Sequence, residues 1–362
     1  MDLDGFKFRD KERADEILEE LQRAGQDLTV MHVCGTHQDT LVRHGLEPLL
    51  KEVGVDIRQG PGCPVCVTNQ REIEEIIKLA EEGVTVTAFG DMINVPGVSS
   101  SLNDAKSMGA EVKIVYGVDD AVKYAENHDE DVVFMSVGFE TTTPSIASAI
   151  LNSPPDNFSI LTCNRVIPPA LKLILETGEI KLDGLIEPGH VSTIIGTEPY
   201  KPLSKKFKIP QVIAGFEPLD LLLAVLLLVR QKQQGRAEVE NEYDRVVKPD
   251  GNIKALEAMK KVFEPKDIEW RGFPTIKNSG LELKDKFKQH DARKIFDHIL
   301  EDVWETEYEE PEGCLCGEVL RGVVDSEECP KFAEECTPQN PIGPCMVSRE
   351  GGCNIAFRYK KK

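Results

Sequence analysis

The sequence has no long hydrophobic run and no excess of basic residues. Its longest apolar stretch is nine residues, Leu221 to Val229, whereas a helix needs about 20 apolar residues to span a bilayer. Lysine and arginine number 43 against 63 aspartates and glutamates, which gives a formal net charge of −20 at pH 7. Because nucleic acids and anionic lipids attract basic surfaces, this charge balance argues against both as partners.

The sequence also lacks a secretory signal, because no apolar segment follows the charged residues at its N-terminus. We therefore expect a cytoplasmic protein without a membrane anchor. Hydrophobic residues nevertheless make up 40% of the chain, which excludes a disordered protein. With 362 residues, and about 150 residues per domain, two or three domains are expected.

Short apolar segments alternate with amphipathic ones through the first two thirds of the chain. Six segments have the composition of buried strands: 28–33, 84–89, 111–116, 131–137, 158–163 and 211–214. The segment 68–82 has its isoleucines on one helical face, and 219–233 is apolar enough for a buried helix. Because strands that alternate with helices form parallel sheets covered by helices, the sequence predicts an α/β fold.

The strand series is too long for one small sheet, so we expect two α/β units. The first is predicted to cover residues 25–117 and the second 118–230. Residues 231–362 are first highly charged and then rich in cysteine, glycine and proline. That composition is typical of a small unit held together by something other than an apolar core, and we group it with residues 1–24.

The ten cysteines are the most informative count in the sequence. Clustered cysteines in a reducing compartment more often bind metal or carry out redox chemistry than form disulfides that stabilise the fold. Six lie near the C-terminus: Cys314, Cys316, Cys329, Cys336, Cys345 and Cys353. Four thiolates can hold either a [4Fe–4S] cluster or a zinc ion. A zinc ion would leave two of the six cysteines unexplained, so we narrowly favour the cluster.

Cys34 stands between a predicted strand and a predicted helix start, in the segment CGTHQDT. Backbone N–H groups and the helix dipole at this position are expected to lower the pKa of its thiol. A thiolate there is either a nucleophile or a ligand for a soft metal, and His37 could pair with it. The alternative interpretation is a buried structural cysteine.

The segment GPGCPVC places Cys63 and Cys66 at a spacing that allows either a disulfide or two ligands of one metal ion. A zinc ribbon would need a second CxxC pair, and the sequence has none. We therefore favour a reversible dithiol. Two unrelated core cysteines are the alternative, but the flanking glycines and prolines argue against it.

Polar or glycine-rich segments follow several of the predicted strands, and they carry Thr36, Asp91, Glu140 and His190. In parallel sheets, binding sites lie beyond the carboxyl ends of the strands, so we expect these four side chains to line a shared site. Each has an ordinary alternative when taken alone. Glu140 and Asp91 could cap helices, and His190 could be a hydrogen-bonded loop histidine.

Nine segments in register give the chain a specific resemblance to a known family. They are CGTHQDT (34–40), GPGCPVC (60–66), FGDMINVPG (89–97), VGFETT (137–142), PGHVSTIIG (188–196), AGFEPLDLL (214–222), GRAEVENEY (235–243), CLCGEVLRG (314–322) and CMVSREGGC (345–353). They extend over nearly the whole chain. With these segments the chain resembles the HypD family of hydrogenase maturation proteins.

The resemblance implies two Rossmann-like α/β domains plus a cluster-bearing domain, and a scaffold on which the Fe(CN)2CO group of [NiFe]-hydrogenase is assembled. Cys34 would hold the iron, with a second thiolate from the small chaperone HypC, and His37 would lie beside the metal. Cys63 and Cys66 match the redox-active pair of the family. Cyanide would arrive from a second partner, HypE.

The [4Fe–4S] ligands of the family follow the spacing C-x14-C-x6-C-x16-C. The cysteines that fit this spacing are Cys314, Cys329, Cys336 and Cys353. The resemblance therefore leaves Cys316 and Cys345 as a spare dithiol that would relay electrons. One position departs from the family pattern, because Asn94 stands where an arginine is common, so another residue would fill the role of that arginine beside Asp91 here.

Two other functions fit the same residues. One is a thiol–disulfide oxidoreductase that acts through Cys63 and Cys66. The other is a zinc-stabilised α/β binding module without turnover. A metal analysis separates the zinc module from the iron scaffold, and the oxidoreductase differs from the scaffold in not needing Cys34.

Overall fold

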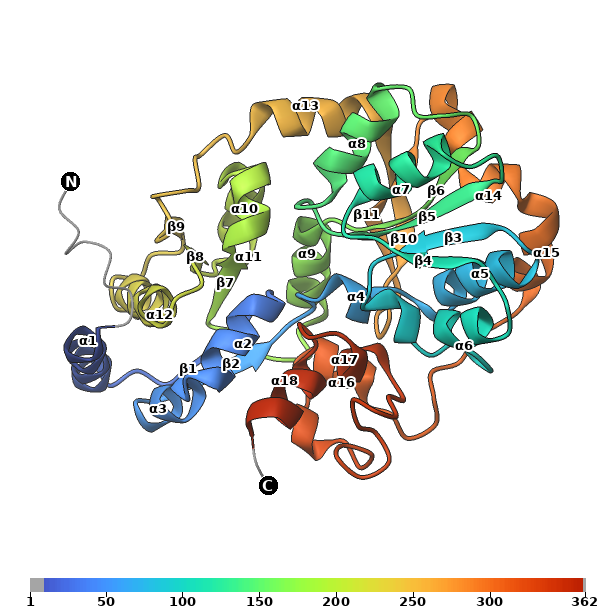
Figure 1. The fold of residues 1–362 in the computed structure, drawn as a ribbon. Helices are drawn as coiled ribbons and strands as arrows, with labels where there is room; N and C mark the ends of the chain where they lie inside the picture. The colour runs from blue at the N-terminus through green and yellow to red at the C-terminus, as the bar shows by residue number, and fades with distance from the viewer. Residues whose placement is uncertain (1–9, 361–362) are drawn as a thin grey trace.

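The computed structural model describes residues 10–360. Residues 1–9 and 361–362 lie outside the described part, so both ends of the predicted unit made of 231–362 and 1–24 are described only in part. The chain forms two parallel β-sheets with flanking helices and a cysteine-rich C-terminal segment (Figure 1). The predicted α/β class with two parallel sheets is confirmed.

The first sheet has the order β2-β1-β7-β8-β9, and all of its strands are parallel. Its strands are β1 (Leu28–His32), β2 (Val55–Gln59), β7 (Gly184–Pro188), β8 (Gln211–Ala214) and β9 (Val239–Asn241). The second sheet has the order β4-β3-β5-β6 and is also parallel. Its strands are β3 (Thr85–Ala88), β4 (Val112–Ile114), β5 (Val132–Gly138) and β6 (Phe158–Asn164).

The two sheets divide the chain differently from the predicted units. Strands β1 and β2 pair with β7, β8 and β9, whereas β3 and β4 pair with β5 and β6. Residues 25–117 therefore contribute to both sheets, and so do residues 118–230. The physical reason is that strand pairing is a long-range contact, which leaves no mark in local composition where the chain passes from one sheet to the other.

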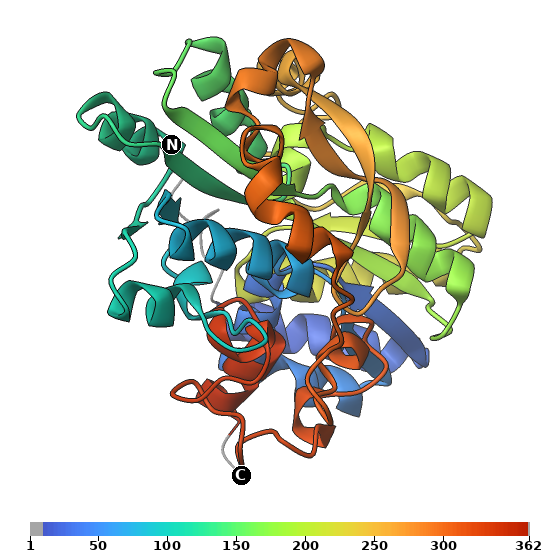
Figure 2. The same ribbon diagram turned by 90° about the vertical axis from the view of Figure 1, so that its right-hand side faces the viewer.

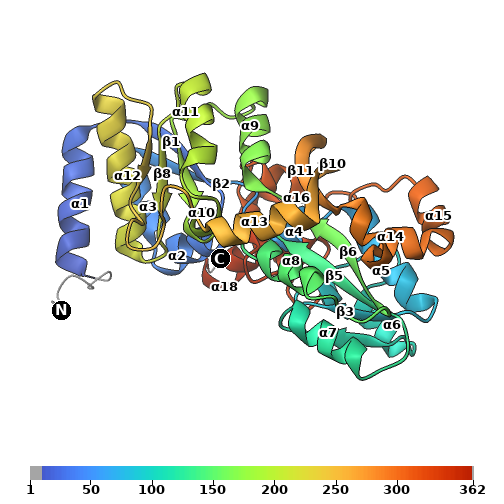
Figure 3. The same cartoon turned by 90° about the horizontal axis from the view of Figure 1, so that it is seen from above.

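The helices up to β7 connect the strands and cover the sheets. They are α1 (Lys11–Ala24), α2 (Gly35–Arg43), α3 (Leu46–Glu52), α4 (Pro64–Val67), α5 (Gln70–Glu81), α6 (Leu102–Ser107), α7 (Val118–Glu126), α8 (Thr143–Leu151) and α9 (Ile167–Thr177). Strands β3 and β4 are also linked by the 3-10 turn η2 (Met92–Asn94). Seen from above, the two sheets with their helices lie side by side (Figure 3).

The second half of the chain adds helices to both sheets. They are α10 (Gly189–Ile195), α11 (Lys201–Phe207), α12 (Pro218–Gln233), α13 (Ile253–Val262), α14 (Ala292–Ile295) and α15 (Asp297–Glu305), with the 3-10 turns η3 (Glu198–Tyr200) and η4 (Asp285–His290). Helix α13 contacts α10 on one side and α8 on the other, so it bridges the two halves of the molecule. An antiparallel pair, β10 (Phe263–Glu269) and β11 (Thr275–Leu283), follows it and packs beside β6.

The C-terminal segment lies against the loops that follow β1 and β2. Its helices are α16 (Cys316–Leu320), α17 (Pro344–Val347) and α18 (Gly352–Tyr359), with the turn η5 (Ser326–Glu328). Helix α18 packs on α2, and α17 packs on α4. Figure 2 shows this segment gathered at one end of the molecule. Its packing brings Glu350 against Gly35, the residue after Cys34, and places α17, which carries Cys345, on the helix that carries Cys66.

Within residues 10–360, no helix combines the length and the apolar composition needed to cross a membrane.

Candidate functional site

Cys34 lies at the point where β1 ends and α2 begins, and it occupies the N-cap position of α2. The glycine-rich loop after β2 lies directly against it, because a Cβ atom on Gly62 would collide with the backbone of Cys34. The N–H of Gly35 donates a hydrogen bond to the carbonyl of Gly62 (3.2 Å). The lack of a side chain at Gly62 thus lets the Cys34 and Cys63 loops touch.

A cleft of about 330 Å³ opens beside Cys34. Its lining residues come from the ends of β1, β2, β5 and β7 and from the C-terminal segment: Val33, Cys34, Thr36, Gly62, Pro64, Phe139, Thr141, Pro188, His190, Val191, Thr193, Ile194 and Glu350. Of the predicted site residues, Cys34, Thr36 and His190 meet in this cleft. His37, Asp91 and Glu140 are not among the residues that line it.

Burial is the main reason why the Cys34 thiol holds its proton near pH 7. It raises the pKa of the thiol to about 11, and the nearby Glu350 carboxylate acts in the same direction. The backbone N–H groups of His37 and Thr36 oppose this rise but do not overcome it. The sequence-based expectation of a lowered thiol pKa is therefore wrong, because burial disfavours the thiolate more than the helix N-terminus stabilises it.

Glu350 is a cleft residue that the sequence reasoning missed. Its backbone lies against Gly35, where an added Cβ would come within 2.5 Å of the Glu350 Cβ. Burial raises the pKa of its carboxyl group, and the charge of Asp91 adds to the rise. The one available signal was its position in the segment CMVSREGGC, between two cysteines.

Asp91 holds the C-terminal segment in place. Its Oδ2 accepts hydrogen bonds from the hydroxyl of Ser348 (3.1 Å) and from the backbone N–H of Arg349 (3.4 Å). These bonds join the loop after β3 to the residues that precede Glu350. Asp91 therefore acts on the cleft through the segment it anchors.

His37 is fully buried behind the cleft. Burial lowers the pKa of its imidazole to about 3, so the ring is neutral near pH 7. Its ring lies 5.3 Å from the ring of Phe216 and 6.2 Å from that of His32, measured between centroids. Within the described residues, neither ring nitrogen has a hydrogen-bond partner of good geometry.

Two buried glutamates lie at the ends of strands. Glu140 accepts a hydrogen bond from the N–H of Ile167 (3.0 Å) at the start of α9, and burial raises its pKa to about 7. Glu187 in β7 is fully buried, and neither carboxyl oxygen has a hydrogen-bond partner among residues 10–360. Burial raises the pKa of Glu187 to about 8. A single carboxylate inside an otherwise apolar strand was not recognised in the sequence.

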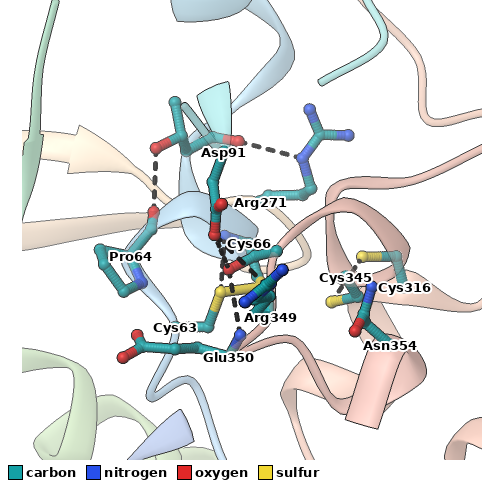
Figure 4. The surroundings of a disulfide bond; sticks show 12 residues. Cys63, Pro64, Cys66, Asp91, Arg271, Cys316, Cys345, Arg349, Glu350 and Asn354 are labelled. Atoms are coloured by element: carbon teal, nitrogen blue, oxygen red, sulfur yellow. Dashed lines mark hydrogen bonds between the residues drawn. A yellow bond between two sulfur atoms is a disulfide. The ribbon is translucent and has the colours of Figure 1, made fainter. Parts of the chain in front are cut away.

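Two pairs of cysteines lie in one apolar region (Figure 4). Cys63 and Cys66 form a disulfide in which both residues are fully buried. The sulfur atoms of Cys316 and Cys345 lie 3.2 Å apart without a covalent bond, and both residues are buried. Because α4, which carries Cys66, packs on α17, which carries Cys345, the disulfide and the second pair lie on adjoining elements.

The remaining C-terminal cysteines, Cys314, Cys329, Cys336 and Cys353, lie near one another. They also adjoin the second pair, because Cys353 is a hydrogen-bond neighbour of Cys345 and Cys314 is an electrostatic neighbour of Cys316. Cys314 and Cys336 each have Cys329 and Cys353 among their electrostatic neighbours, and burial is the largest cause of the raised pKa of both thiols. Gly343 permits a close approach, because a Cβ there would lie 3.3 Å from the sulfur of Cys314. These four soft donors could hold an iron–sulfur cluster, in which each thiolate binds a separate iron atom. Among residues 10–360, no group of three or more His, Cys, Asp or Glu has the geometry to hold one metal ion.

The comparisons with known proteins cover the whole described chain. Residues 10–360 match the profile of the HypD family, described as "Hydrogenase formation hypA family". A putative hydrogenase expression/formation protein of Methanocaldococcus jannaschii is 45% identical over 338 residues, which is 92% of each chain. The hydrogenase maturation factors HypD2 of Bradyrhizobium diazoefficiens and HypD of Cupriavidus necator are each 42% identical, over 98% of this chain and 96% of theirs. The chain therefore belongs to the HypD family of hydrogenase maturation factors.

Proposed function

We propose that this chain is a scaffold for assembly of the Fe(CN)2CO group of [NiFe]-hydrogenase and that Cys34 holds the iron. The observation that carries the proposal is the cleft, in which Cys34 is the one cysteine among the lining residues. A thiolate is a soft ligand that suits iron bearing cyanide and carbon monoxide. The hydroxyl groups of Thr36, Thr141 and Thr193 and the imidazole of His190 supply polar groups around it.

The raised pKa of the Cys34 thiol fits a site whose cysteine stays protonated until iron enters the cleft. A buried thiol with a pKa of about 11 stays protonated near pH 7 and is a weak nucleophile. An incoming iron displaces the proton, because metal coordination deprotonates a thiol. Glu350 lies close enough to influence the Cys34 charge, and we propose that its carboxylate receives this proton.

The cleft leaves room for ligands from partner proteins. We propose that the N-terminal cysteine of the small chaperone HypC supplies a second thiolate to the iron, and that HypE delivers cyanide. Both assignments follow from the family resemblance. The cleft supports them through its size of about 330 Å³ and its position between both sheets and the C-terminal segment.

We propose that Cys314, Cys329, Cys336 and Cys353 hold a [4Fe–4S] cluster, which would store and pass single electrons. The six C-terminal cysteines then divide into four ligands and the Cys316–Cys345 pair. In the exchange we propose, the Cys316 and Cys345 thiols form a disulfide while the Cys63–Cys66 disulfide becomes two thiols. Two electrons and two protons pass from one pair to the other, so the step balances.

Full burial of the Cys63–Cys66 disulfide argues for a partner within this chain. A general thiol–disulfide oxidoreductase must expose its disulfide to the thiol of another protein. We therefore place the oxidoreductase second among the candidate functions.

Hydrogenase maturation in cells tests the proposal. Cys34→Ala should abolish maturation, while the purified variant keeps its cluster absorbance and about four irons per chain. Cys163→Ala is the matched control, because Cys163 is a buried cysteine in β6 and does not line the cleft. Retained maturation in Cys34→Ala would favour the oxidoreductase, and a colourless protein with stoichiometric zinc would favour the zinc module.

A further inference from the structure

Two of the family-like segments, 214–222 and 235–243, have no part in the proposed function, yet they meet beside the cleft. Phe216, which follows β8, is the residue at their centre. Its ring stacks on His190, with 3.8 Å between ring centroids and 26° between ring planes. Its centroid also lies 5.3 Å from that of His37. One phenylalanine thus contacts both histidines that the sequence analysis assigned to the site.

The Phe216 ring is itself held in place by its surroundings. Tyr243 meets it edge to face, with centroids 5.7 Å apart and planes at 84°. The hydroxyl of Thr40 in α2 donates to the carbonyl of Phe216 (2.7 Å). Gly189 provides the space, because a Cβ there would lie 3.1 Å from the Phe216 ring and 2.5 Å from the carbonyl oxygen of Ala214.

Acidic side chains fix the peptide groups on both sides of Phe216. The fully buried Asp220 accepts hydrogen bonds from the N–H of Glu217 (3.1 Å) and from the guanidinium of Arg245 (2.5 Å). Glu242 accepts a hydrogen bond from the N–H of Gly215 (3.1 Å). The Asp220–Arg245 hydrogen bond is charge-assisted, and such bonds are roughly twice as strong as neutral ones, so the backbone that carries Phe216 is firmly anchored.

We propose that Phe216 is a positioning residue that sets the ring plane of His190 at the Cys34 cleft. The His190 side chain is exposed, so without the stacking contact with Phe216 its ring would rotate among several rotamers. Stacking covers one face of the imidazole and leaves its edge, where both nitrogens lie, for a ligand. The ligand class that suits this edge is a small anion that accepts a hydrogen bond, such as a metal-bound cyanide. The identity of this ligand rests on the proposed function, whereas the stacking does not.

The reactivity of His190 toward diethyl pyrocarbonate tests the positioning role without iron. We expect Phe216→Leu, which keeps apolar volume but lacks a flat ring, to raise carbethoxylation of His190 several-fold, measured by mass spectrometry, because a ring released from stacking turns its nitrogens out of the cleft into solvent. Phe216→Tyr should restore the wild-type rate. The exposed His298 serves as internal standard in each sample, and Phe207→Leu, a change at the end of α11, is the matched control.

Equal His190 reactivity in Phe216→Leu and wild type would overturn the proposal, because a ring that only fills space can be replaced by leucine. Should Phe216→Leu give little folded protein, Phe216→Met allows the same comparison. Infrared spectra of protein co-purified with the chaperone provide the second readout. Phe216→Leu and His190→Gln should shift the cyanide bands in the same direction. If the wild-type protein shows no cyanide bands, the iron-scaffold function is refuted. The carbethoxylation result then still decides whether Phe216 positions His190.

Discussion

At the scale of single residues, burial affects the pKa of the Cys34 thiol more strongly than the helix N-terminus beside it does. A helix N-terminus stabilises an anion by about 0.3–1 kcal/mol, whereas each unit of pKa shift corresponds to about 1.4 kcal/mol. Burial raises the pKa of Cys34 from 9.0 to about 11 despite the N–H groups of Thr36 and His37. The sequence revealed the strand–helix junction but not how deeply it is buried.

Glu350→Gln should make Cys34 more reactive toward iodoacetamide at about pH 8, because removal of the carboxylate lowers the pKa of the thiol. We expect an increase below about tenfold, since burial, which is the larger cause, remains. The rate is measured by mass spectrometry of the peptide that contains Cys34. Glu16→Gln on α1 is the control, and an unchanged rate in Glu350→Gln would contradict this account of the cleft.

Glu187 should make the folded protein less stable as the pH rises. Burial raises its pKa from 4.5 to about 8, so the folded state keeps a proton that the unfolded state loses. Between these two values the free energy of unfolding should fall with increasing pH, by up to about 1.4 kcal/mol per pH unit from this group. The loss is complete once the pH exceeds the folded-state pKa.

Glu187→Gln removes this contribution, because an amide does not ionise. Urea unfolding at about pH 6 and about pH 8 should therefore give the variant a flatter pH dependence than the wild type and greater stability at the higher pH. Glu257→Gln, an exposed change on α13, should leave the wild-type dependence intact. Parallel pH profiles for the wild type and Glu187→Gln would show that Glu187 is ionised in the folded protein.

At the scale of secondary-structure elements, amphipathic patterns were the most reliable guide. The predicted helix 68–82 is α5, and Ile73, Ile76 and Ile77 on its apolar face are buried. The helix begins slightly later than predicted, with Asn69 as its N-cap, because the Asn69 and Glu72 side chains each accept a hydrogen bond from the backbone N–H of the other residue. The predicted helix 219–233 is α12.

Strands β2, β7, β9, β10 and β11 were not predicted from the sequence. The local signals of β9 and β10 are especially weak. Strand β10 contains Pro265 and mostly exposed charged residues, and β9 has only three residues. Both are stabilised by pairing with segments distant in the sequence, β11 and β8. No local periodicity reports such pairing, so no strand was predicted among the highly charged residues that follow residue 230.

Gly62→Ala should destabilise the contact between the Cys34 loop and the Cys63 loop. An added Cβ would collide with the backbone of Cys34, and overpacking of this kind costs about 1–3 kcal/mol. Gly117→Ala is the matched control, because a Cβ there meets no atom within 4 Å. We expect a lower urea midpoint for Gly62→Ala only, and equal midpoints for the two variants would contradict the described contact.

At the scale of the whole molecule, the site depends on contacts that local sequence does not encode. Motifs after predicted strands pointed to a shared site, and Thr36 and His190 do line the cleft with Cys34. The cleft also takes Thr141 from the end of β5 in the second sheet and Glu350 from the C-terminal segment. The predicted domain boundary at residue 117 did not allow for this arrangement, because it assigned one contiguous segment of the chain to each α/β unit.

Infrared spectroscopy of the protein, co-purified without oxygen with the small chaperone, tests iron binding by Cys34 most directly. Wild-type protein should show stretching bands of iron-bound cyanide and carbon monoxide. In Cys34→Ala the bands should disappear, while Cys163→Ala retains them. Bands that persist unchanged in Cys34→Ala, or that are absent from the wild type, would contradict the assignment of Cys34 as the iron ligand.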